Sequence, residues 1–402
     1  MPNMGKAVHT LLLEERKRVK NVYYLSLTLM LFALGWAISA PFYTINMQSI
    51  IQDALLLGIF FSMWGLIRFF TDTFFGAFFD FIDNKKIILI SLVGYALVGI
   101  AYYFVNNIIP LFILRIFHIL IGSLFWVGVW AYTHKISPKN RREENIMFET
   151  IFLNAPYLIA PFIGALLFAI TSPKIVFLAI PITILPAIII FSIKGKPTKQ
   201  KKKITIKKIL KKEIRIIREN KKKVLTLFYV MTPQFLVSSA FFIFLPIYLL
   251  NQGYGAYFIA LTATITVIPS LLTLPLGKFA DKNGRIPVFT AGTIALTMGL
   301  LLFYYATTSL LLLISIFIIG SGFAIISPTA NAIVGDLSGK NEKGTLSGIT
   351  ETAKDLGMMI GPIIGGIVLN ISTLQLLSLL LSIIPVSTML LALIFGKIPK
   401  KA

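Results

Sequence analysis

Two short polar stretches, GAFFDFIDNKKI at residues 76–87 and GKFADKNGRIPV at residues 277–288, interrupt long apolar runs of this chain. In the second stretch, Gly277 and Asp281 follow their counterparts in the first by 201 residues, half of the 402-residue length. Loops this short make consecutive helices antiparallel neighbours, and their glycines permit tight turns. The equal spacing predicts a chain built from two similar halves.

The composition indicates a membrane protein. The residues AVILMFWYC make up 56% of the chain and charged residues only 13%, which is not the balance of a soluble domain of this size. A transmembrane helix needs about 20 mostly apolar residues, and open sheets cannot satisfy their backbone in lipid. We predict an all-α integral membrane protein with twelve transmembrane helices. Their approximate spans, in order, are 22–46, 53–80, 86–105, 109–134, 146–170, 174–194, 223–250, 255–281, 286–306, 309–336, 344–370 and 373–396.

The net charge of +22 reflects membrane topology and does not indicate nucleic-acid binding. Lys and Arg gather at the termini and in the even-numbered loops, apart from Arg68, Arg115 and Lys354 inside spans and Lys174 in an odd-numbered loop. By the positive-inside rule, both termini are expected in the cytoplasm, and the basic excess would attract anionic lipid. The charged first 21 residues do not resemble a cleavable signal peptide.

The largest shift in composition is at residues 194–223, where fifteen Lys or Arg stand against two Glu. Isoleucines and a leucine recur there at helical spacing, which predicts an amphipathic helix on the inner leaflet. We interpret the segment as a topology-fixing linker that binds lipid head groups; a regulatory partner site is the alternative. It would separate an N-terminal six-helix bundle, residues 1–193, from a C-terminal six-helix bundle, residues 224–402.

A second pair of matching segments supports the duplication. APFIG at residues 160–164 matches GPIIG at residues 361–365, again 201 residues apart. Two anchors with one offset indicate that the two six-helix bundles are pseudo-symmetric repeats. Parallel repeats with a binding site between them are typical of one large class of secondary transporters.

The motifs resemble those of the major facilitator superfamily, along essentially the whole chain. The family's signature after the second helix is G-x-x-x-D-R-x-G-R-[RK]. The first copy matches it at Gly76, Asp80, Lys85 and Lys86, and the copy after the eighth span matches more closely, at Gly277, Asp281, Lys282, Gly284 and Arg285. The eleventh span carries G-x8-G-x3-GP-x2-GG as Gly348, Gly357, Gly361, Pro362, Gly365 and Gly366. The family has that pattern in the fifth helix of antiporters, where this chain keeps only Pro161 and Gly164.

The resemblance implies a role for the two loop acids. Asp80 and Asp281 end the second and eighth spans, where a carboxylate is poorly placed for the dipole of its own helix. In the family, the first-half Asp faces the amino-terminal end of the eleventh helix and latches the cytoplasmic side shut. The same latch is implied for Asp80, with Asp281 facing the fifth span; the alternative is that these loops only hold topology.

Charges inside the spans are costly in hydrocarbon and therefore need a partner or a cavity. Arg68 and Asp72 lie one turn apart in the second span, and Glu351, Lys354 and Asp355 cluster in the eleventh. Counted at about 1.5 Å per residue from the cytoplasmic ends, their depths match. Because these two helices are neighbours in the family, we predict the pair Arg68–Asp355. We also predict the pair Asp72–Lys354, with Glu351 nearby. Such pairs act either as static salt bridges or as a gate that opens when a carboxylate is protonated.

The resemblance implies a central cavity lined by the first, fourth, seventh and tenth helices. In the fourth span, Arg115, His118 and Trp126 share one helical face. Similar faces of the other three helices carry Trp36, Ser39 and Tyr43; Gln234, Ser238, Phe241 and Tyr248; and Gly320, Ala324, Ser327 and Asn331. The implied cavity is aromatic, bears hydroxyls and has one cation. Packing alone would also explain aromatic faces, and His118 is either a hydrogen-bonded interior histidine or a proton carrier.

Three classes of function are compatible with such a chain. A proton-coupled secondary transporter is favoured, because no GxxxxGK[ST] loop occurs to power primary transport. A membrane enzyme would need a converging nucleophile or metal cluster, and a chain without cysteine and with three histidines offers neither. A non-transporting sensor with a transporter fold is the third class. We expect no cofactor, a small-molecule substrate, protons and lipid as partners, and a monomer.

The implied cavity and the glycine pattern indicate the class of substrate. We favour efflux of amphipathic compounds across the cytoplasmic membrane, because the implied cavity is aromatic and the pattern of the eleventh span resembles drug antiporters. The alternative is a proton-coupled importer of a small organic anion or sugar-like solute, with Arg115 clamping the anion.

Overall fold

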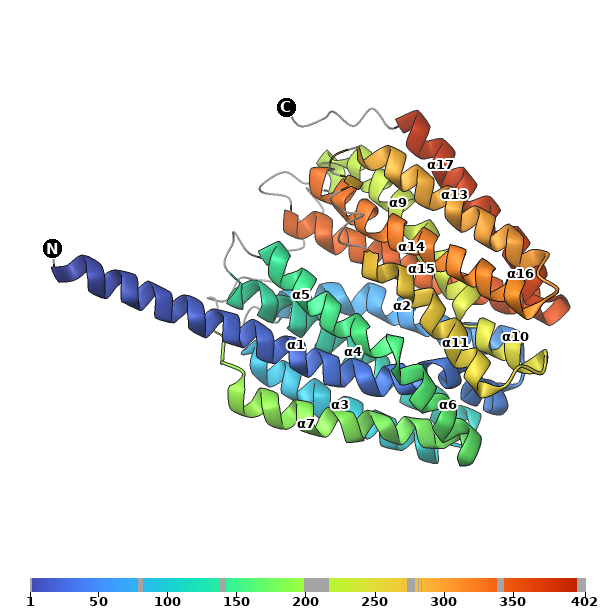
Figure 1. The fold of residues 1–402 in the computed structure, drawn as a ribbon, viewed down its shortest axis with the longest axis horizontal. Helices are drawn as coiled ribbons and strands as arrows, with labels where there is room; N and C mark the ends of the chain where they lie inside the picture. The colour runs from blue at the N-terminus through green and yellow to red at the C-terminus, as the bar shows by residue number, and fades with distance from the viewer. Residues whose placement is uncertain are drawn as a thin grey trace. The chain divides into compact units, whose positions relative to one another are not determined.

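The computed structural model describes residues 2–78, 82–137, 142–198, 217–272, 279–280, 282, 284–337 and 343–395. Within these ranges the regular elements are helices (Figure 1). Ten of the described helices are long and apolar enough to cross a membrane. Two shorter apolar stretches, Ala256–Leu271 and Leu374–Met389, lie within the two remaining predicted spans. The predicted fold class, all-α with twelve transmembrane helices in two six-helix bundles, is confirmed.

The helices follow one another in the predicted order. Those of the first half are α1 (Pro2–Ile51), α2 (Ala54–Phe78), α3 (Asn84–Phe104), α4 (Ile108–Ile136), α5 (Arg142–Asn154), η1 (Ala155–Leu158), α6 (Ala160–Ile170), η2 (Pro173–Leu178) and α7 (Ala179–Lys194). Those of the second half are α9 (Lys221–Phe242), α10 (Leu245–Asn251), α11 (Ala256–Val267), η3 (Ile268–Leu272), α13 (Arg285–Tyr304), α14 (Ser309–Leu337), α15 (Lys343–Ile371), α16 (Leu374–Leu381) and α17 (Ile383–Phe395).

Proline breaks several spans that the sequence pattern presents as single helices. The predicted span 146–170 consists of α5, the 3-10 turn η1 and α6, and Pro156 and Pro161 lie at the starts of the last two. Likewise, Pro246 is the second residue of α10, where the seventh predicted span is interrupted. Proline has no backbone N–H and fits the first turn of a helix better than its interior. Each of these prolines therefore marks the start of a new helix within one predicted span.

The chain forms two compact units. Unit 1 contains residues 1–40, 71–105 and 116–203, and unit 2 contains residues 41–70, 106–115 and 204–402. The division passes through α1, α2 and α4, so unit 2 holds the end of α1, most of α2 and the start of α4. The domain boundaries at 193 and 223 are not those of the two units and stay a prediction. The predicted amphipathic helix falls mostly on residues 199–216, outside the described residues.

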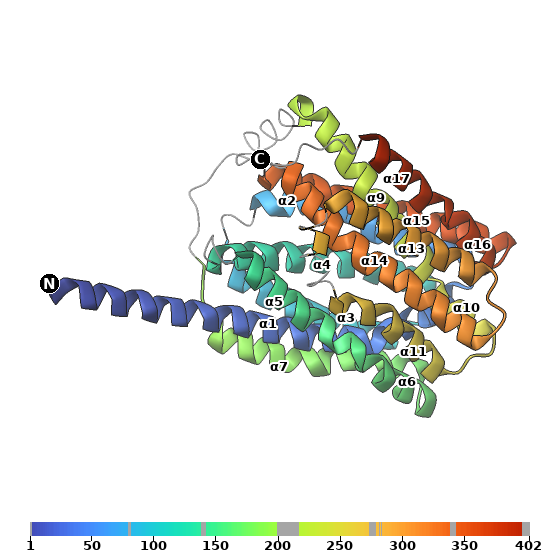
Figure 2. The same cartoon turned by 45° about the horizontal axis from the view of Figure 1, so that its top comes forward.

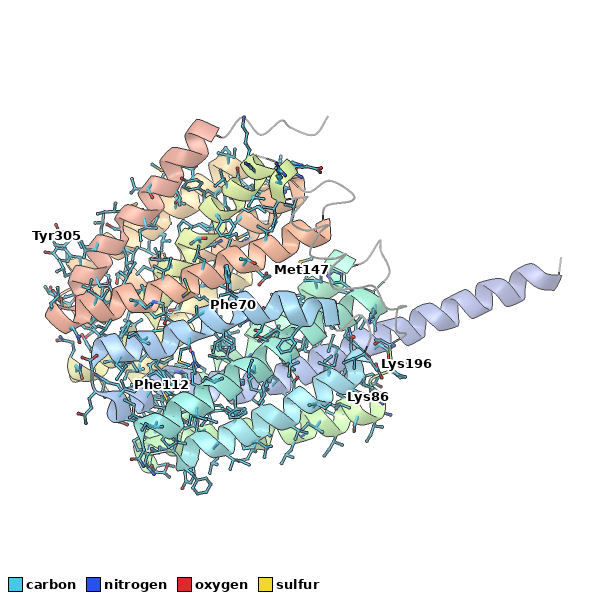
Figure 3. All side chains as sticks on the ribbon, turned by 180° about the vertical axis from the view of Figure 1, so that it is seen from behind. Phe70, Lys86, Phe112, Met147, Lys196 and Tyr305 are labelled. Carbon is cyan, nitrogen blue, oxygen red and sulfur yellow. The ribbon has the colours of Figure 1, made fainter. Side chains whose placement is uncertain are left out.

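In unit 1, polar contacts fix both ends of α3, which lies beside α7 (Figure 1). At its carboxyl end, Lys174 Nζ donates to the Val105 carbonyl at 2.7 Å, which gives the isolated basic residue of an odd-numbered loop a partner. At its amino end, Asp83 accepts from the backbone N–H of Lys85 at 3.1 Å and from that of Thr198 at 2.8 Å. Figure 3 shows Lys196, two residues before Thr198, at this same end of unit 1. The chain after α7 is thus attached to the start of α3.

In unit 2, α15 packs closely on α9, and α13 lies along α14 (Figure 2). On α15, Gly357, Gly361 and Gly365 face α9, and a Cβ at any of them would collide with atoms of α9 or of the residues just after it. Small residues let membrane helices approach until their backbones touch. Two hydroxyl groups of α9 donate hydrogen bonds across this contact: Thr232 Oγ1 to the Ala353 carbonyl at 2.9 Å and Ser239 Oγ to the Gly357 carbonyl at 3.3 Å.

Candidate functional site

The first part of α2 and the second part of α15 form an antiparallel pair inside unit 2. Asp53 lies opposite Asn370 at one end, and Arg68 lies opposite Asp355 at the other. The same number of residues separates these two contacts on both helices, so the register is constant over about 22 Å at 1.5 Å per residue. We call residues 53–68 and 355–370 the α2–α15 seam.

Glycines bring the backbones of the seam into direct contact. A Cβ on Gly58 would meet the Pro362 carbonyl, and one on Gly65 would meet the Asp355 carbonyl. From the other side, a Cβ on Gly366 would meet the carbonyl of Ala54. The predicted glycine pattern of α15 therefore faces two helices, with Gly357, Gly361 and Gly365 toward α9 and Gly366 toward α2. Gly348 meets no atom within 4 Å and has no such role in this structure.

The end of the seam at Asp53 and Asn370 is held by hydrogen bonds. Asp53 Oδ1 accepts from the Leu56 N–H at 2.7 Å, so it also caps α2. Its Oδ2 accepts from Asn370 Nδ2 at 3.2 Å, while Asn370 Oδ1 accepts from the Ala54 N–H at 3.2 Å. The start of α2 and the end of α15 thus hold each other by reciprocal bonds.

The other end of the seam carries the predicted ion pair. Arg68 Nη1 lies 3.6 Å from Asp355 Oδ1, and their side chains are 11% and 2% exposed. The structure therefore contains the Arg68–Asp355 pair; its role as a gate stays a prediction. Next to it, Lys354 Nζ lies 2.7 Å from Glu351 Oε1. Asp72 belongs to the part of α2 in unit 1, so the predicted Asp72–Lys354 pair would join the two units and stays a prediction.

Arg115 is buried at the start of α4, within unit 2. Its Nη1 donates to Tyr43 Oη at 3.0 Å, and its Nε donates to the Phe60 carbonyl at 3.3 Å. The rings of Phe60, Phe61 and Trp64 lie 4.9, 5.3 and 5.6 Å from its guanidinium carbon. The guanidinium is thus held by a hydroxyl, two backbone carbonyls and aromatic faces.

His118 is the centre of an aromatic cluster in unit 1. Its ring stacks on Trp36 at 4.9 Å with an interplanar angle of 11°, and its Nδ1 is 3.1 Å from Tyr102 Oη. Tyr95 packs edge-on against both His118 and Trp36. Trp126 extends the cluster through Phe125 and Phe32. The structure brings Trp36, His118 and Trp126 into one cluster, in which His118 is a buried, hydrogen-bonded histidine.

A cavity of about 220 Å³ opens within unit 2, among α9, α11 and α14. It is lined by Gln234, Phe235, Ser238, Phe242, Thr266, Phe323 and Ser327. The lining combines three phenylalanines with three hydroxyls and one carboxamide, and none of these side chains is charged. Phe242 and Phe323 form one aromatic wall, with ring centroids 5.8 Å apart.

Two further predicted cavity residues, on α9 and α14, do not line this cavity either. Phe241 is fully buried and packs edge-on against Phe303 of α13 at 4.8 Å, whereas the neighbouring Phe242 faces Phe323 of α14. Asn331 is exposed on α14, one turn beyond Ser327. Of the predicted positions, Gln234 and Ser238 on α9 and Ser327 on α14 line the cavity, and Gln234 is 6% exposed.

The sequence model of the Major Facilitator Superfamily matches residues 25–362 and 259–402. The chain belongs to the Major Facilitator Superfamily. Its fold agrees with that assignment: the solved structure of the nucleoside transporter NupG superimposes with a TM-score of 0.78, at 15% identity, over 94% of this chain and all of that one.

Relatives in the superfamily differ in their substrates. The chain is 26% identical to an uncharacterized transporter of this superfamily from Methanocaldococcus jannaschii, over 88% of this chain and 92% of the relative. It is 34% identical to the riboflavin transporter RibZ of Clostridioides difficile over 29% of this chain and 24% of that protein. It is 31% identical to the multidrug resistance efflux pump PmrA of Streptococcus pneumoniae over 31% of this chain and 32% of that pump. These proteins are transporters and not enzymes.

The superfamily's loop motif is described only in part. Asp80 and Asp281 lie outside the described residues, so their latch role stays a prediction. Gly284 has a left-handed φ of 93° just before α13, a conformation that favours glycine. The next residue, Arg285, lies 2.9 Å from Asp336 Oδ2 and donates to the Ala332 carbonyl. The second motif copy thus fastens the start of α13 to the end of α14.

Two residues near these sites were not among the predictions. The ring centroid of Trp64 lies 5.6 Å from the guanidinium carbons of both Arg68 and Arg115, so one ring is close to two buried cations. Its position one turn before Arg68 was a signal for a shared helical face. Glu149 is 2% exposed on α5, and an acid inside a predicted span was the signal for it.

Proposed function

We propose that this superfamily member is a proton-coupled secondary transporter that exports amphipathic aromatic compounds across the cytoplasmic membrane by alternating access. The observation that carries the proposal is the uncharged aromatic cavity of unit 2. A small ion would lose its hydration there without gaining a counter-charge from the lining. An aromatic compound with a few polar atoms could instead stack on Phe242 or Phe323 and bond to Gln234.

The relatives support this substrate class. The efflux pump PmrA matches a third of the chain and is named for multiple drugs, and the riboflavin transporter RibZ is named for an aromatic vitamin. Both names are compatible with an aromatic ligand site. The proposal also includes a direction of transport, export by antiport with protons. The glycine pattern of α15 is the feature that favours antiport.

Import of an organic anion, the alternative, depends on Arg115 as a clamp. In this structure that guanidinium is bonded to Tyr43 and to a backbone carbonyl of α2 and is 4% exposed. An anion could reach it only after these contacts break. The geometry therefore favours a role for Arg115 in holding the start of α4 against α2.

The α2–α15 seam provides the gate of the proposed cycle. With both termini in the cytoplasm, Asp53 and Asn370 lie on the outer side, so the seam is closed there in this conformation. Opening the cavity outward requires α2 to separate from α15. We propose that protonation of Asp355 weakens its pair with Arg68 and so favours the separation of α2 from α15. We also propose that the transporter works as a monomer.

Transport assays with chemically distinct probes test the proposal. In proteoliposomes with an imposed pH gradient, we expect gradient-driven movement of ethidium and none of benzoate, with riboflavin as a neutral aromatic probe. Phe323→Ala should reduce ethidium movement, whereas Phe317→Ala, which removes an exposed ring on the same helix, should not. Benzoate movement without ethidium movement would support the anion importer instead. Binding without movement of any probe would support the sensor.

A further inference from the structure

Glu149 is a buried carboxylate that the proposed gate does not use. It lies on α5, about 10 Å along the helix from Arg142 at 1.5 Å per residue. The residue is 2% exposed, and it points at Thr133 of α4, which is fully buried. Both residues belong to unit 1.

Two side-chain hydrogen-bonding contacts, one helical turn apart, connect α4 and α5 at this point. Asn145 Nδ2 donates to Ser137 Oγ at 2.9 Å. One turn along both helices, Thr133 Oγ1 lies 3.0 and 2.8 Å from the two carboxylate oxygens of Glu149. A hydroxyl carries a single proton, so it can donate to only one of these oxygens at a time. Within the described residues, the carboxylate therefore has one neutral donor for two oxygens.

The charged neighbours do not compensate Glu149. On α4, Lys135 donates to Asn84 Oδ1 at 3.2 Å, and His134 is exposed. From α1, the phenol ring of Tyr23 packs against Phe152, one turn beyond Glu149. Within the described part of the chain, no Lys, Arg or His forms an ion pair with Glu149. Among the described residues, an ionised carboxylate at this position would therefore be buried without a counter-charge, which is strongly unfavourable.

We propose that Glu149 is a proton-binding site that makes the α4–α5 contact responsive to pH on the side of the membrane facing the termini. In this conformation it is the neutral acid, hydrogen-bonded to Thr133. When its proton passes to water, the ionised side chain needs more donors than Thr133 offers, so α4 and α5 separate enough to admit water. No covalent bond of the protein changes, and the proton returns to the same oxygens. The inference deepens the proposed function, because it rests on proton-coupled transport and supplies a second proton site beside Asp355.

The first test is a spectroscopic one that needs no substrate. Infrared difference spectra of the lipid-reconstituted full chain near neutral pH should show a protonated carboxyl band that disappears in Glu149→Gln. The matched control Glu219→Gln removes an exposed acid and should leave that band unchanged. Glutamine keeps the shape of glutamic acid and can accept from Thr133, so the variant is expected to fold. A band that persists in Glu149→Gln, or no such band in the wild type, would overturn the proposal.

The second test concerns the consequence for packing. Hydrogen exchange of α4 and α5 amides, compared between wild type and Glu149→Gln at each pH, should show protection lost from the wild type alone as pH rises. Equal protection at every pH would overturn the link to helix packing. Neither test uses ethidium. If both succeed while ethidium is not transported, the proposed substrate and direction fail and the proton site stands.

Discussion

At the scale of single residues, the Arg68–Asp355 pair is a buried electrostatic constraint within unit 2. Both side chains are nearly excluded from solvent, so removing one partner takes a counter-charge away from a buried charge. Such a change typically costs about 3–5 kcal/mol, whereas an exposed pair contributes about 0–1 kcal/mol. Lys354 and Glu351, whose side chains are 18% and 46% exposed, form the contrasting pair one turn away.

We therefore expect Arg68→Met to lower the thermal stability of the detergent-solubilised protein strongly, and Arg68→Met with Asp355→Leu to recover part of the loss. The coupling should be on the order of 1–3 kcal/mol in a double-mutant cycle. The control Glu351→Gln should lower stability by less than about 1 kcal/mol. Additive effects of Arg68→Met and Asp355→Leu would show that the pair contributes nothing in the folded protein.

The same pair shows which contacts sequence can predict. Arg68 and Asp355 were paired from two premises: their depths match, since helices rise by the same distance per residue, and the family resemblance implies that their two helices are neighbours. Arg115 could not be placed in this way. Its aromatic face suits a cavity and a packed interior equally well, and only the positions of Tyr43 and Phe60 decide between them.

At the scale of elements, the close contact between α2 and α15 depends on residues without side chains. A methyl group on Gly366 would collide with the backbone of Ala54 and Leu55, which cannot move without displacing the start of α2. Gly348 lies on the same helix and meets nothing within 4 Å. Alanine substitutions at the two positions therefore distinguish the effect of helix propensity, which both share, from the steric requirement of the seam, which applies to Gly366.

We expect Gly366→Ala to lower the thermal stability and to favour the conformation in which the seam is open. Gly348→Ala should raise stability by about 0.5–1 kcal/mol, because alanine is the better helix former. Thermal unfolding measures the first effect. The open conformation is measured with a cysteine introduced at Ser238, in the cavity, which should react faster with a thiol reagent added from outside when the seam is open. If Gly366→Ala left this reactivity unchanged, the result would argue against a gate at this seam.

Element boundaries were less predictable than element positions. Hydropathy places a span wherever about 20 apolar residues occur, but it does not see that Pro156 and Pro161 divide the span 146–170. The length of α1, from Pro2 to Ile51, also exceeds its apolar span 22–46, since helix formation continues into charged residues that hydropathy assigns to a terminus.

At the scale of the whole molecule, the duplication and the twelve spans follow from the sequence, because a repeat offset and apolar length are one-dimensional properties. The division into two compact units does not follow from the sequence. They divide α1, α2 and α4 inside their spans, and this division depends on packing between segments distant in the chain, such as α2 against α15. No periodicity in the second span distinguishes residues 54–70 from residues 71–78.

The orientation of these units in the membrane can be tested directly because the chain has no cysteine. Single cysteines at the exposed positions Asn107 and Gln252 should react with an impermeant thiol reagent added to intact cells. Cysteines at the exposed positions Lys196 and Lys282 should react only after the membrane is permeabilised. The reason is the charge pattern: Lys196 and Lys282 lie in the basic, even-numbered loops that the positive-inside rule retains in the cytoplasm, whereas Asn107 and Gln252 lie in loops without Lys or Arg. Labelling of Lys196→Cys in intact cells, with Asn107→Cys protected, would reverse the orientation and move the Asp53–Asn370 end of the seam to the cytoplasmic side.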